Sequence, residues 1–353
     1  MDRPLDFFLG SVSSRGFCSL FPTLSAQPEL YLYLIKAGPG CGKSTLMRQL
    51  AQKAPGPVEH IHCSSDPDSL DGVILWQQKA ALLDATAPHT LEPACPGARE
   101  RVVSLYHILD HPALRRQLEP ITRQFARCHE LHRQASQHIA AAGQLLAERR
   151  RACVPWVDAN RAVRYAQRLG ARLLPMADPP GQMQTRLLSA VTPQGIVVFR
   201  DTVRTLADRI IVLHDDLGAV SPLIQQQLLN RAQRCGQPVI CCPCSLDPQG
   251  PPEHLLFPQL RLAVLTGNEF HPFAFPGQQN VRCARFVDVA PLQQWRNKLH
   301  FQQQTALALL HQAMDLQRQA KTAHDKLEQF YQRAADFSAI APIRAALEAE
   351  LQI

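Results

Sequence analysis

The sequence predicts an α/β protein made of two similar halves, each a three-layer core around a parallel sheet that is followed by a long helical hairpin. Three observations predict this architecture. Short apolar runs typical of buried strands alternate with segments of helical periodicity. Several sequence blocks recur roughly 180 residues later, and two long stripes of apolar residues follow helical spacing. The length of 353 residues also favours two domains over one small module.

The composition is typical of a protein with sizeable buried cores. With 46% hydrophobic and 19% charged residues, the chain is neither disordered nor fibrous. No run approaches the roughly 18 apolar residues of a membrane span, and the N-terminus lacks the pattern of a secretory signal. We therefore expect a cytoplasmic protein whose eleven cysteines are reduced.

A glycine-rich loop in the first half lies between a predicted strand and a predicted helix. The apolar residues 31–35 predict the strand, and residues 44–53 predict the helix. Between them, residues 37–44 match the phosphate-binding P-loop pattern, with alanine instead of glycine at the first position. Such a loop turns its N–H groups toward phosphates at a helix N-terminus. The residues expected to bind the phosphates of ATP are Gly38, Pro39, Gly40, Cys41, Gly42, Lys43, Ser44 and Thr45.

The loop chemistry assigns roles to its charged and hydroxyl side chains. Lys43 is expected to reach the β and γ phosphates, and the Ser44 hydroxyl to bind Mg²⁺. The third predicted strand, residues 80–84, ends in Asp84, which fits a carboxylate that helps to hold Mg²⁺. Asp66 and Asp68 compete for that role, in a polar loop predicted after the strand at residues 58–63, although turn formation beside Pro67 would also explain them.

Two histidines are weaker candidates for the same site. His62 and His89 each follow a predicted strand, so they could contact phosphate or substrate. The alternative is that both are buried structural side chains with satisfied hydrogen bonds.

The second half repeats the first. Residues 8–17 align with residues 187–196, which are 179 positions later, and residues 81–89 align with residues 263–271, which are 182 positions later. The strand and turn at 210–218 align at an offset of 178, and the strand end at 239–247 aligns at an offset of 179. A nearly constant offset predicts a tandem duplication of one unit.

The second copy lacks the residues expected to bind phosphate. Val220 replaces Gly42, and Ser221 replaces Lys43. Pro222 replaces Ser44, and it has no N–H to give to a phosphate. Thr266 replaces Asp84, and two acids, Asp215 and Asp216, would repel a triphosphate. A single working nucleotide site, in the first half, is therefore expected.

The cysteine-rich segment 241–244 contains a C-x-x-C pattern. Because it aligns with the strand end at residues 62–65, we interpret it as part of the repeated core. A redox or zinc site is the alternative, since Cys235 and His254 are near in sequence.

Two helical arms are expected, one after each core. The apolar stripes cover residues 114–146 and 295–337, each is followed by a break at Pro155 or Pro342, and a shorter helix follows. Each long helix would fold back on its own arm or pack against the other, and the arms could also mediate oligomers. The predicted divisions are an active core at 1–110, a basic arm at 111–176, a degenerate core at 177–290 and a C-terminal arm at 291–353.

The first arm carries the excess positive charge. Residues 111–186 contain thirteen arginines and five acids, a net charge of +8, against +7 for the whole chain. The functional interpretation is a contact surface for nucleic acid, an acidic protein or membrane phosphate, and its densest point is Arg149, Arg150 and Arg151. The alternative is an ordinary solvated helix face.

Four segments together resemble an uncharacterised bacterial family of tandem-repeat predicted ATPases. They are AGPGCGKST at 37–45, HCSSDPDSLDGV at 62–73, LLDATAPH at 82–89 and SAVTPQG at 189–195. The resemblance implies a P-loop NTPase fold and Mg²⁺-dependent ATP binding. In that family both halves tend to look like nucleotide-binding domains, whereas here the second half departs from the pattern.

Three functions remain open at this point. The chain is expected to hydrolyse ATP and couple the nucleotide state to its arms, to phosphorylate a small molecule with Asp66 or Asp68 as base or substrate anchor, or to act as a nucleotide-gated scaffold with little turnover. ATP is favoured over GTP because the sequence has no N-K-x-D motif. The P-loop does not separate a hydrolase from a kinase, since both use the same phosphate-binding groups.

Overall fold

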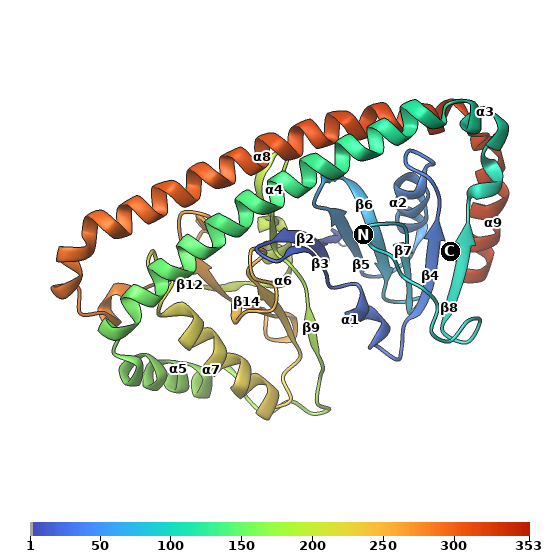
Figure 1. The fold of residues 1–353 in the computed structure, drawn as a ribbon. Helices are drawn as coiled ribbons and strands as arrows, with labels where there is room; N and C mark the ends of the chain where they lie inside the picture. Colours follow the sequence, from blue (N-terminus) through green and yellow to red (C-terminus); the bar gives the residue numbers. More distant parts are fainter. Residues whose placement is uncertain (1–2) are drawn as a thin grey trace.

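The computed structural model describes residues 3–353 and consists of two six-stranded sheets beneath a pair of long helices (Figure 1). The first sheet contains, in spatial order, β1 (Leu5–Phe8), β5 (Val58–Cys63), β6 (Asp66–Leu75), β7 (Ala80–Asp84), β4 (Tyr31–Lys36) and β8 (Glu100–Ser104). The second contains β9 (Met183–Thr185), β13 (Val239–Pro243), β14 (Pro252–Phe257), β15 (Leu262–Gly267), β12 (Arg209–His214) and β16 (Gln279–Arg282). The α/β class and the strands at 31–35, 58–63 and 80–84 are confirmed.

The two sheets have the same strand order and the same pairing sense. In each sheet, three pairs of neighbours are parallel, while the third strand along the sheet is antiparallel to both neighbours. The expectation of purely parallel sheets is therefore wrong for β6 and β14. The reason lies in the connections. Residues 64–65 and 76–79 on either side of β6, and residues 244–251 and 258–261 on either side of β14, are too few for the crossover that parallel neighbours need.

Helices and two small hairpins surround the sheets. The helices are α1 (Pro22–Ser25), α2 (Lys43–Lys53), α3 (His111–Arg116), α4 (Leu118–Cys153), α5 (Ala159–Leu173), α6 (Arg200–Leu206), α7 (Ser221–Arg234), α8 (Arg296–Arg333) and α9 (Ile340–Leu351). The hairpins pair β2 (Gly10–Ser13) with β3 (Gly16–Ser19) and β10 (Ser189–Thr192) with β11 (Gly195–Val198).

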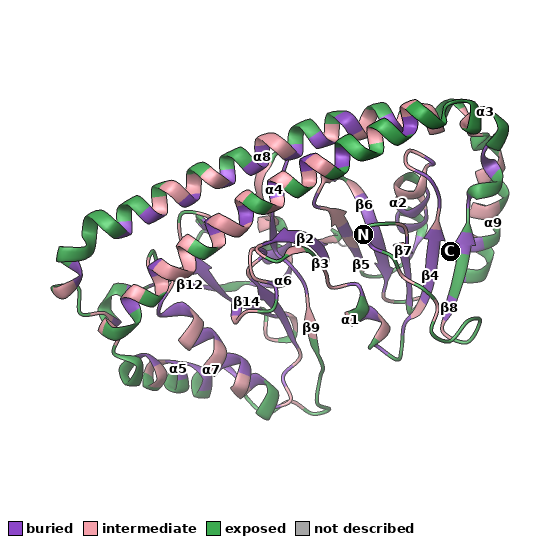
Figure 2. Ribbon diagram, viewed as in Figure 1, coloured by how far each residue is buried: buried purple, intermediate pink, exposed green. Residues whose placement is uncertain are grey.

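The long helices α4 and α8 pack side by side and run in opposite directions (Figure 1). Their buried residues recur along one stripe of each helix, as the purple positions of Figure 2 show. Ala135, Ile139 and Ala142 of α4 share a cluster with Ala306, Leu310 and Ala313 of α8. The predicted long helices are thus confirmed, and each packs against the other.

Each long helix carries the chain from one core to the other. After α4, helix α5 packs on α7 of the second core, with Ala166 and Leu169 beside Leu228. After α8, helix α9 packs on α2 of the first core, with Leu347 and Leu351 in the cluster that contains Leu50. Each core is therefore completed by a helix that follows the other core in sequence.

The break before α9 lies earlier than expected. The chain leaves helical geometry around Asp336, whose φ of -88° and ψ of 92° are extended, and Asp336 caps the short 3-10 helix Phe337–Ala339. Pro342 lies inside the first turn of α9, where a proline is tolerated because its missing N–H has no helical partner.

One continuous apolar core contains residues from both sheets. Leu34 and Ile74 of the first sheet share it with Val212 and Leu256 of the second. The sheets are also joined by backbone hydrogen bonds in both directions between Phe8 and Leu187 (both 2.9 Å).

A buried ion pair crosses the same boundary. Arg186 Nε lies 2.9 Å from Glu59 Oε2, and the side chains are 0% and 2% exposed. Glu59 also accepts a hydrogen bond from the indole N–H of Trp76 at 3.1 Å. Because both charges are desolvated, each depends on the other to remain in the interior.

None of the helices described in residues 3–353 combines the length and the apolar character needed to cross a bilayer, even though α4 and α8 are long.

We expect the Glu59–Arg186 pair to be essential for the stability of the joined halves. Arg186→Ala leaves the Glu59 carboxylate buried and unpaired, which should cost about 3–5 kcal/mol. The measurement is the urea midpoint of unfolding, followed by circular dichroism. Arg151→Ala, which breaks only the exposed pair with Glu148, is the control and should leave the midpoint unchanged. Equal midpoints for the two variants would contradict the expectation.

Candidate phosphate-binding site

The glycine-rich loop of the first half lies between β4 and α2. Gly40 and Gly42 have positive φ angles of 65° and 80°, which a glycine adopts without strain. Helix α2 then begins at Lys43, and its first N–H groups have no helical partner. Within residues 3–353, the N–H groups of Gly40 to Ser44 donate no hydrogen bond. The loop therefore presents several unpaired donors at a helix N-terminus, the arrangement that suits an anion.

Lys43 and Asp84 meet at the edge of the sheet beside this loop. β4 and β7 are parallel neighbours, so their carboxyl ends place Asp84 opposite Ile35. Lys43 Nζ donates to the Gly38 carbonyl at 3.0 Å and lies 3.4 Å from Asp84 Oδ2. Asp84 Oδ1 accepts from the N–H of Thr86 at 2.9 Å, leaving Oδ2 to face the lysine. The structure thus brings together the two charged residues that the sequence predicted.

The predicted metal ligand Ser44 lies on the first turn of α2, next to Lys43. Its Oγ accepts a hydrogen bond from the N–H of Leu70 in β6 at 2.9 Å. A serine hydroxyl has two acceptor positions and one donor, so this contact leaves a lone pair and the hydrogen unused. Thr45, the next residue, is exposed.

Asp66 and Asp68 lie in strand β6, so the expectation of a polar loop at 62–72 is wrong there. Asp66 Oδ2 accepts from Ser69 at 2.8 Å and lies 3.4 Å from Lys321 Nζ of α8. Asp68 Oδ2 accepts from Gln194 Nε2 at 2.8 Å, in the β10–β11 turn. Both carboxylates therefore bind the second half, and no hydrogen bond or ion pair joins either of them to Lys43 or Asp84 among the described residues.

The C-terminal arm covers the loop. A Cβ on Gly38 would lie 2.6 Å from Tyr331, and one on Gly40 would lie 2.9 Å from Glu328. A Cβ on Gly42 would lie 3.1 Å from Ile340, at the start of α9. The glycines are thus required both for the turn of the loop and for the approach of α8 and α9. The sequence does not predict these neighbours, because nothing local links residues 328–340 to residues 38–42.

A pair formed by an acid and a histidine, Asp71 and His89, lies near the same strand ends. The sequence had singled out His89 but not Asp71. His89 Nε2 lies 2.9 Å from Asp71 Oδ2, and both side chains are buried. Burial opposes protonation of His89, but the Asp71 carboxylate, with a smaller contribution from Asp84, outweighs it, so the pKa of His89 is raised above its usual value. Phe17 and Phe21 pack against the ring.

The second half carries the same kind of pair. Glu253 Oε1 lies 3.4 Å from His271 Nδ1. Asp71 and Glu253 are 182 positions apart, as are His89 and His271. This shared offset is the sequence signal that could have found Asp71. The other candidate, His62, binds Asp6 at 2.8 Å instead.

The corresponding loop of the second half uses its own carboxylate in place of an external anion. Asp215 Oδ2 accepts from the N–H groups of Val220 (2.8 Å) and Ser221 (2.7 Å), and Oδ1 accepts from Gly218 at 3.1 Å. Asp215 occupies the position of Ala37 at the offset of 178 residues. The N–H groups of this loop are therefore not available to a triphosphate, because they already donate to the Asp215 carboxylate.

A cavity of about 450 Å³ adjoins this second loop. Its wall includes Asp215, Thr266 and Arg150, together with apolar residues such as Leu246 and Phe270. The wall also contains buried polar atoms without a hydrogen-bond partner, among them Thr266 Oγ1. The space beside the second loop is therefore open to a small molecule, although the loop donors are occupied.

The C-x-x-C segment is built into the second sheet. Cys241 and Cys242 lie in β13 and are buried, and burial raises the pKa of the Cys241 thiol to about 11. All eleven cysteines are free, and the groups with metal-ligand spacing in the described part of the chain contain no cysteine. The interpretation of 241–244 as a core segment accounts for these features.

The arginines of the first arm have different environments. Arg149 is buried: it donates to the carbonyls of Leu299 and Asp216 and to Gln303, so it joins α4 to α8 and to the second loop. Arg151 is exposed and pairs with Glu148. The expectation that Arg149 belongs to an exposed basic surface is therefore wrong.

Comparisons with known protein families, curated proteins and solved structures found no match for this chain.

We expect Asp71 to hold the proton of His89. Asp71→Asn removes the opposing charge, so burial should dominate and lower the pKa of His89 below the unfolded value of about 6.5. Because the wild-type pKa is raised, the pair stabilises the fold fully below pH 6.5, and this contribution is lost as the pH rises through the folded pKa.

The measurement is an NMR titration of the His89 imidazole, with Asp68→Asn as the matched control on the same strand. The control should titrate as the wild type does. An unchanged midpoint in Asp71→Asn would contradict the assignment.

We also expect the Asp215 carboxylate to hold the second loop. Asp215→Ala leaves the N–H groups of Val220 and Ser221 without their acceptor, which should cost about 1–3 kcal/mol of stability. Hydrogen exchange should accelerate at Val220 and Ser221. Asp216→Ala, at the exposed neighbouring position, is the control, and equal exchange in both variants would count against the role of Asp215.

Proposed function

We propose that the first half binds Mg²⁺-ATP at residues 37–45 and hydrolyses it. This proposal rests on a difference between the strand-to-helix loops of the two halves. The loop of the second half satisfies its N–H groups with Asp215, whereas the first has Ala37 at that position and unpaired donors. Donors left open at a helix N-terminus suit the oxygens of a phosphate chain.

The neighbouring side chains support a triphosphate with its metal. Lys43 supplies the positive charge that a β or γ phosphate needs, and it lies within reach of the loop through Gly38. Asp84 and Ser44 provide a carboxylate and a hydroxyl, the oxygen ligands that Mg²⁺ prefers. When ATP and Mg²⁺ bind, the phosphates would replace Asp84 as the partner of Lys43, and Asp84 would turn to the metal.

We further propose that the chain is a tandem duplication in which one copy kept the phosphate chemistry. The equal strand order and pairing sense of the two sheets support this origin, as do the recurring acid–histidine pairs. The fold of each core would then be of the P-loop NTPase type, with an added antiparallel strand.

The C-terminal arm is the element that would respond to the nucleotide. Tyr331, Glu328 and Ile340 lie against the glycines that would hold the phosphates. Glu328 also brings a negative charge toward the loop, so a bound phosphate chain would repel it. Nucleotide binding would therefore alter the packing of α8 and α9 on the first core.

A nucleotide-gated scaffold is the second candidate. Asp66 and Asp68 were the alternative carboxylates for this site, as Mg²⁺ ligands or as the base or substrate anchor of a kinase, but both bind partners in the second half. With these carboxylates engaged elsewhere, a scaffold would bind the nucleotide with slow turnover and respond mainly by a structural change. The same engagement removes the specific support for a small-molecule kinase.

Lys43→Ala tests the site directly. Losing the positive charge should weaken ATP binding and lower phosphate release at least about 100-fold, the scale of losing one preorganised electrostatic contact to the reacting group. Ser221→Ala changes the corresponding position of the second half and is the control. Isothermal titration and phosphate release measure the two effects, and unchanged ATP binding in Lys43→Ala would contradict the proposed site.

Hydrogen exchange in residues 328–343 is measured with and without Mg²⁺-ATP. Exchange rates that do not change with the nucleotide would contradict both candidate functions. Both candidates require a nucleotide-dependent change there, and only the ATPase also requires phosphate release that Lys43→Ala abolishes.

A further inference from the structure

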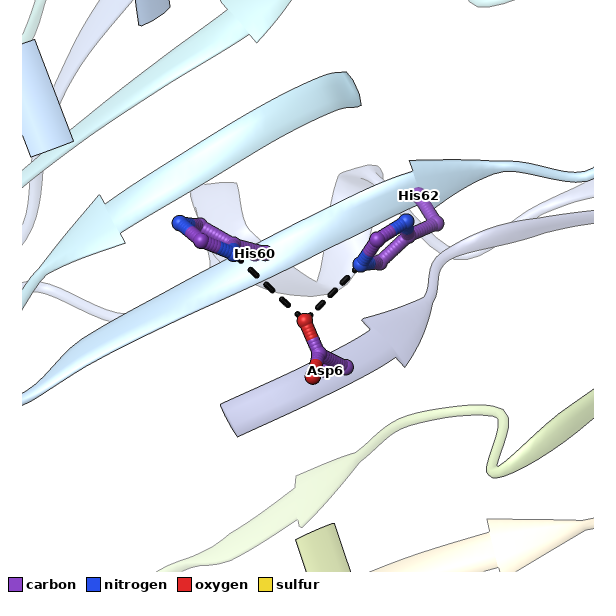
Figure 3. A group of neighbouring side chains, drawn as sticks. All are labelled: Asp6, His60 and His62. Carbon is purple, nitrogen blue, oxygen red and sulfur yellow. Dashed lines mark hydrogen bonds and ion pairs between the residues drawn. The ribbon is translucent and has the colours of Figure 1, made fainter. Parts of the chain in front are cut away.

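A carboxylate and two histidines meet at the edge of the first sheet, away from the glycine-rich loop (Figure 3). β1 and β5 are parallel neighbours with Asp6 opposite His60, and His62 lies two residues further on the same face of β5. Asp6 Oδ1 lies 2.8 Å from His62 Nε2 and 3.4 Å from His60 Nδ1. The three side chains are only 29%, 14% and 17% exposed, in the order Asp6, His62, His60.

The hydrogen bonds of His62 determine what can lie between it and Asp6. His62 Nδ1 is 2.7 Å from the carbonyl oxygen of Pro67, which can only accept, so Nδ1 carries a proton. In the neutral ring, Nε2 then has a lone pair aimed at a carboxylate oxygen 2.8 Å away. A cation bound by these two atoms and shared with His60 would satisfy both lone pairs.

We propose that Asp6, His60 and His62 form a binding site for a divalent transition metal of the Zn²⁺ class. Imidazole nitrogens with one carboxylate oxygen suit such ions, and three protein ligands leave a fourth position for water. The contact between Nδ1 of His62 and the Pro67 carbonyl is the outer hydrogen bond that orients a metal-binding histidine.

The two other groups with similar spacing lack these features. In the group of Glu253, His254 and His271, Nδ1 of His254 accepts from the N–H of Thr266 at 3.2 Å. Nε2 of His254 therefore carries the proton and offers no lone pair to a metal. In the third group, on α8, Asp325 already binds Lys321 at 2.6 Å.

The pairing of the two strands does not require Asp6, His60 and His62. The corresponding strands of the second sheet, β9 and β13, place Gln184 opposite Ile240, and their backbone pairing is the same. An ion at Asp6 would also stabilise the contact between the two halves. The Asp6 N–H donates to Thr202 Oγ1 at 2.8 Å, and Thr202 Oγ1 donates back to the Asp6 carbonyl at 2.9 Å, in the first turn of α6. The metal would fix β1 where it meets the second half.

The test uses the full-length chain after treatment with a chelator and dialysis. Isothermal titration with ZnCl₂ should give one equivalent bound per chain, and Co²⁺ should give the visible absorption of a site with nitrogen and oxygen ligands. His62→Gln and His60→Gln should each weaken Zn²⁺ binding at least about 10-fold, the lower end of the loss caused by removing even an outer partner of a ligand. His254→Gln is the matched control and should bind as the wild type does.

Circular dichroism must show that each variant is folded, and two separate histidine variants keep the test informative if one of them does not fold. Equal Zn²⁺ affinity in the wild type and both variants would overturn the site. An absence of Zn²⁺ binding in the folded wild type would also overturn it. Because Asp84, a proposed Mg²⁺ ligand at the ATP site, is not a ligand here, Zn²⁺ binding that persists in Asp84→Ala distinguishes this site from the proposed ATP site.

Discussion

The antiparallel packing of α4 against α8 is the constraint on which the arrangement of the molecule depends. Cys128 of α4 contacts the Ala320 carbonyl, and Arg149 contacts the Leu299 carbonyl, so the two helices stay in register from one core to the other. Each helix therefore delivers the chain to the opposite core. Helix α5 covers the second sheet beside α7, and α9 covers the first beside α2. Neither half buries its own sheet without a helix from the other, so the two halves depend on each other for their cores.

This exchange explains why the glycine-rich loop has such close neighbours. The end of α8 must turn over residues 38–42 for Leu347 of α9 to reach the core beside α2. A side chain on Gly38 would collide with Tyr331, so the loop sequence is limited by the arm as well as by the turn. Across the same molecule, Glu59 and Arg186 join the sheets through a charge pair that water does not reach. A change at the loop would thus act on a helix that is itself held to both cores.

Sequence periodicity was enough to predict β4, β5 and β7 and the two long helices, since each depends on an apolar run or an apolar stripe. The glycine-rich motif and the acid at the end of β7 singled out Lys43 and Asp84, which the structure places 3.4 Å apart. Periodicity could not predict β6, because Asp66 and its neighbours are typical of a turn while pairing with β5 holds them extended; β7 pairs only with the later part of the strand, from Gly72 to Leu75. An apolar stripe shows which face of a helix is buried but not what buries it, so the exchanged positions of α5 and α9 were not foreseen. Arg149 was misjudged for a related reason, since its charge is satisfied by carbonyls of distant segments.

The two loops show how little must change for one fold to gain or lose an anion site. Both lie between a buried strand and a helix, and both present N–H groups at the helix start. In the second half, Asp215 returns its own carboxylate to those groups, so the loop is held by an anion that is part of the chain. In the first half, Ala37 has no acceptor to offer, and the donors stay open. A loop without an internal anion gains stability from an external one by mass action, because such a ligand binds the folded loop and not the unfolded chain. The covalently held carboxylate stabilises the second loop at any ligand concentration. If the first loop binds ATP as proposed, its stability depends on the nucleotide concentration, and the arm packed on it would respond to the bound nucleotide.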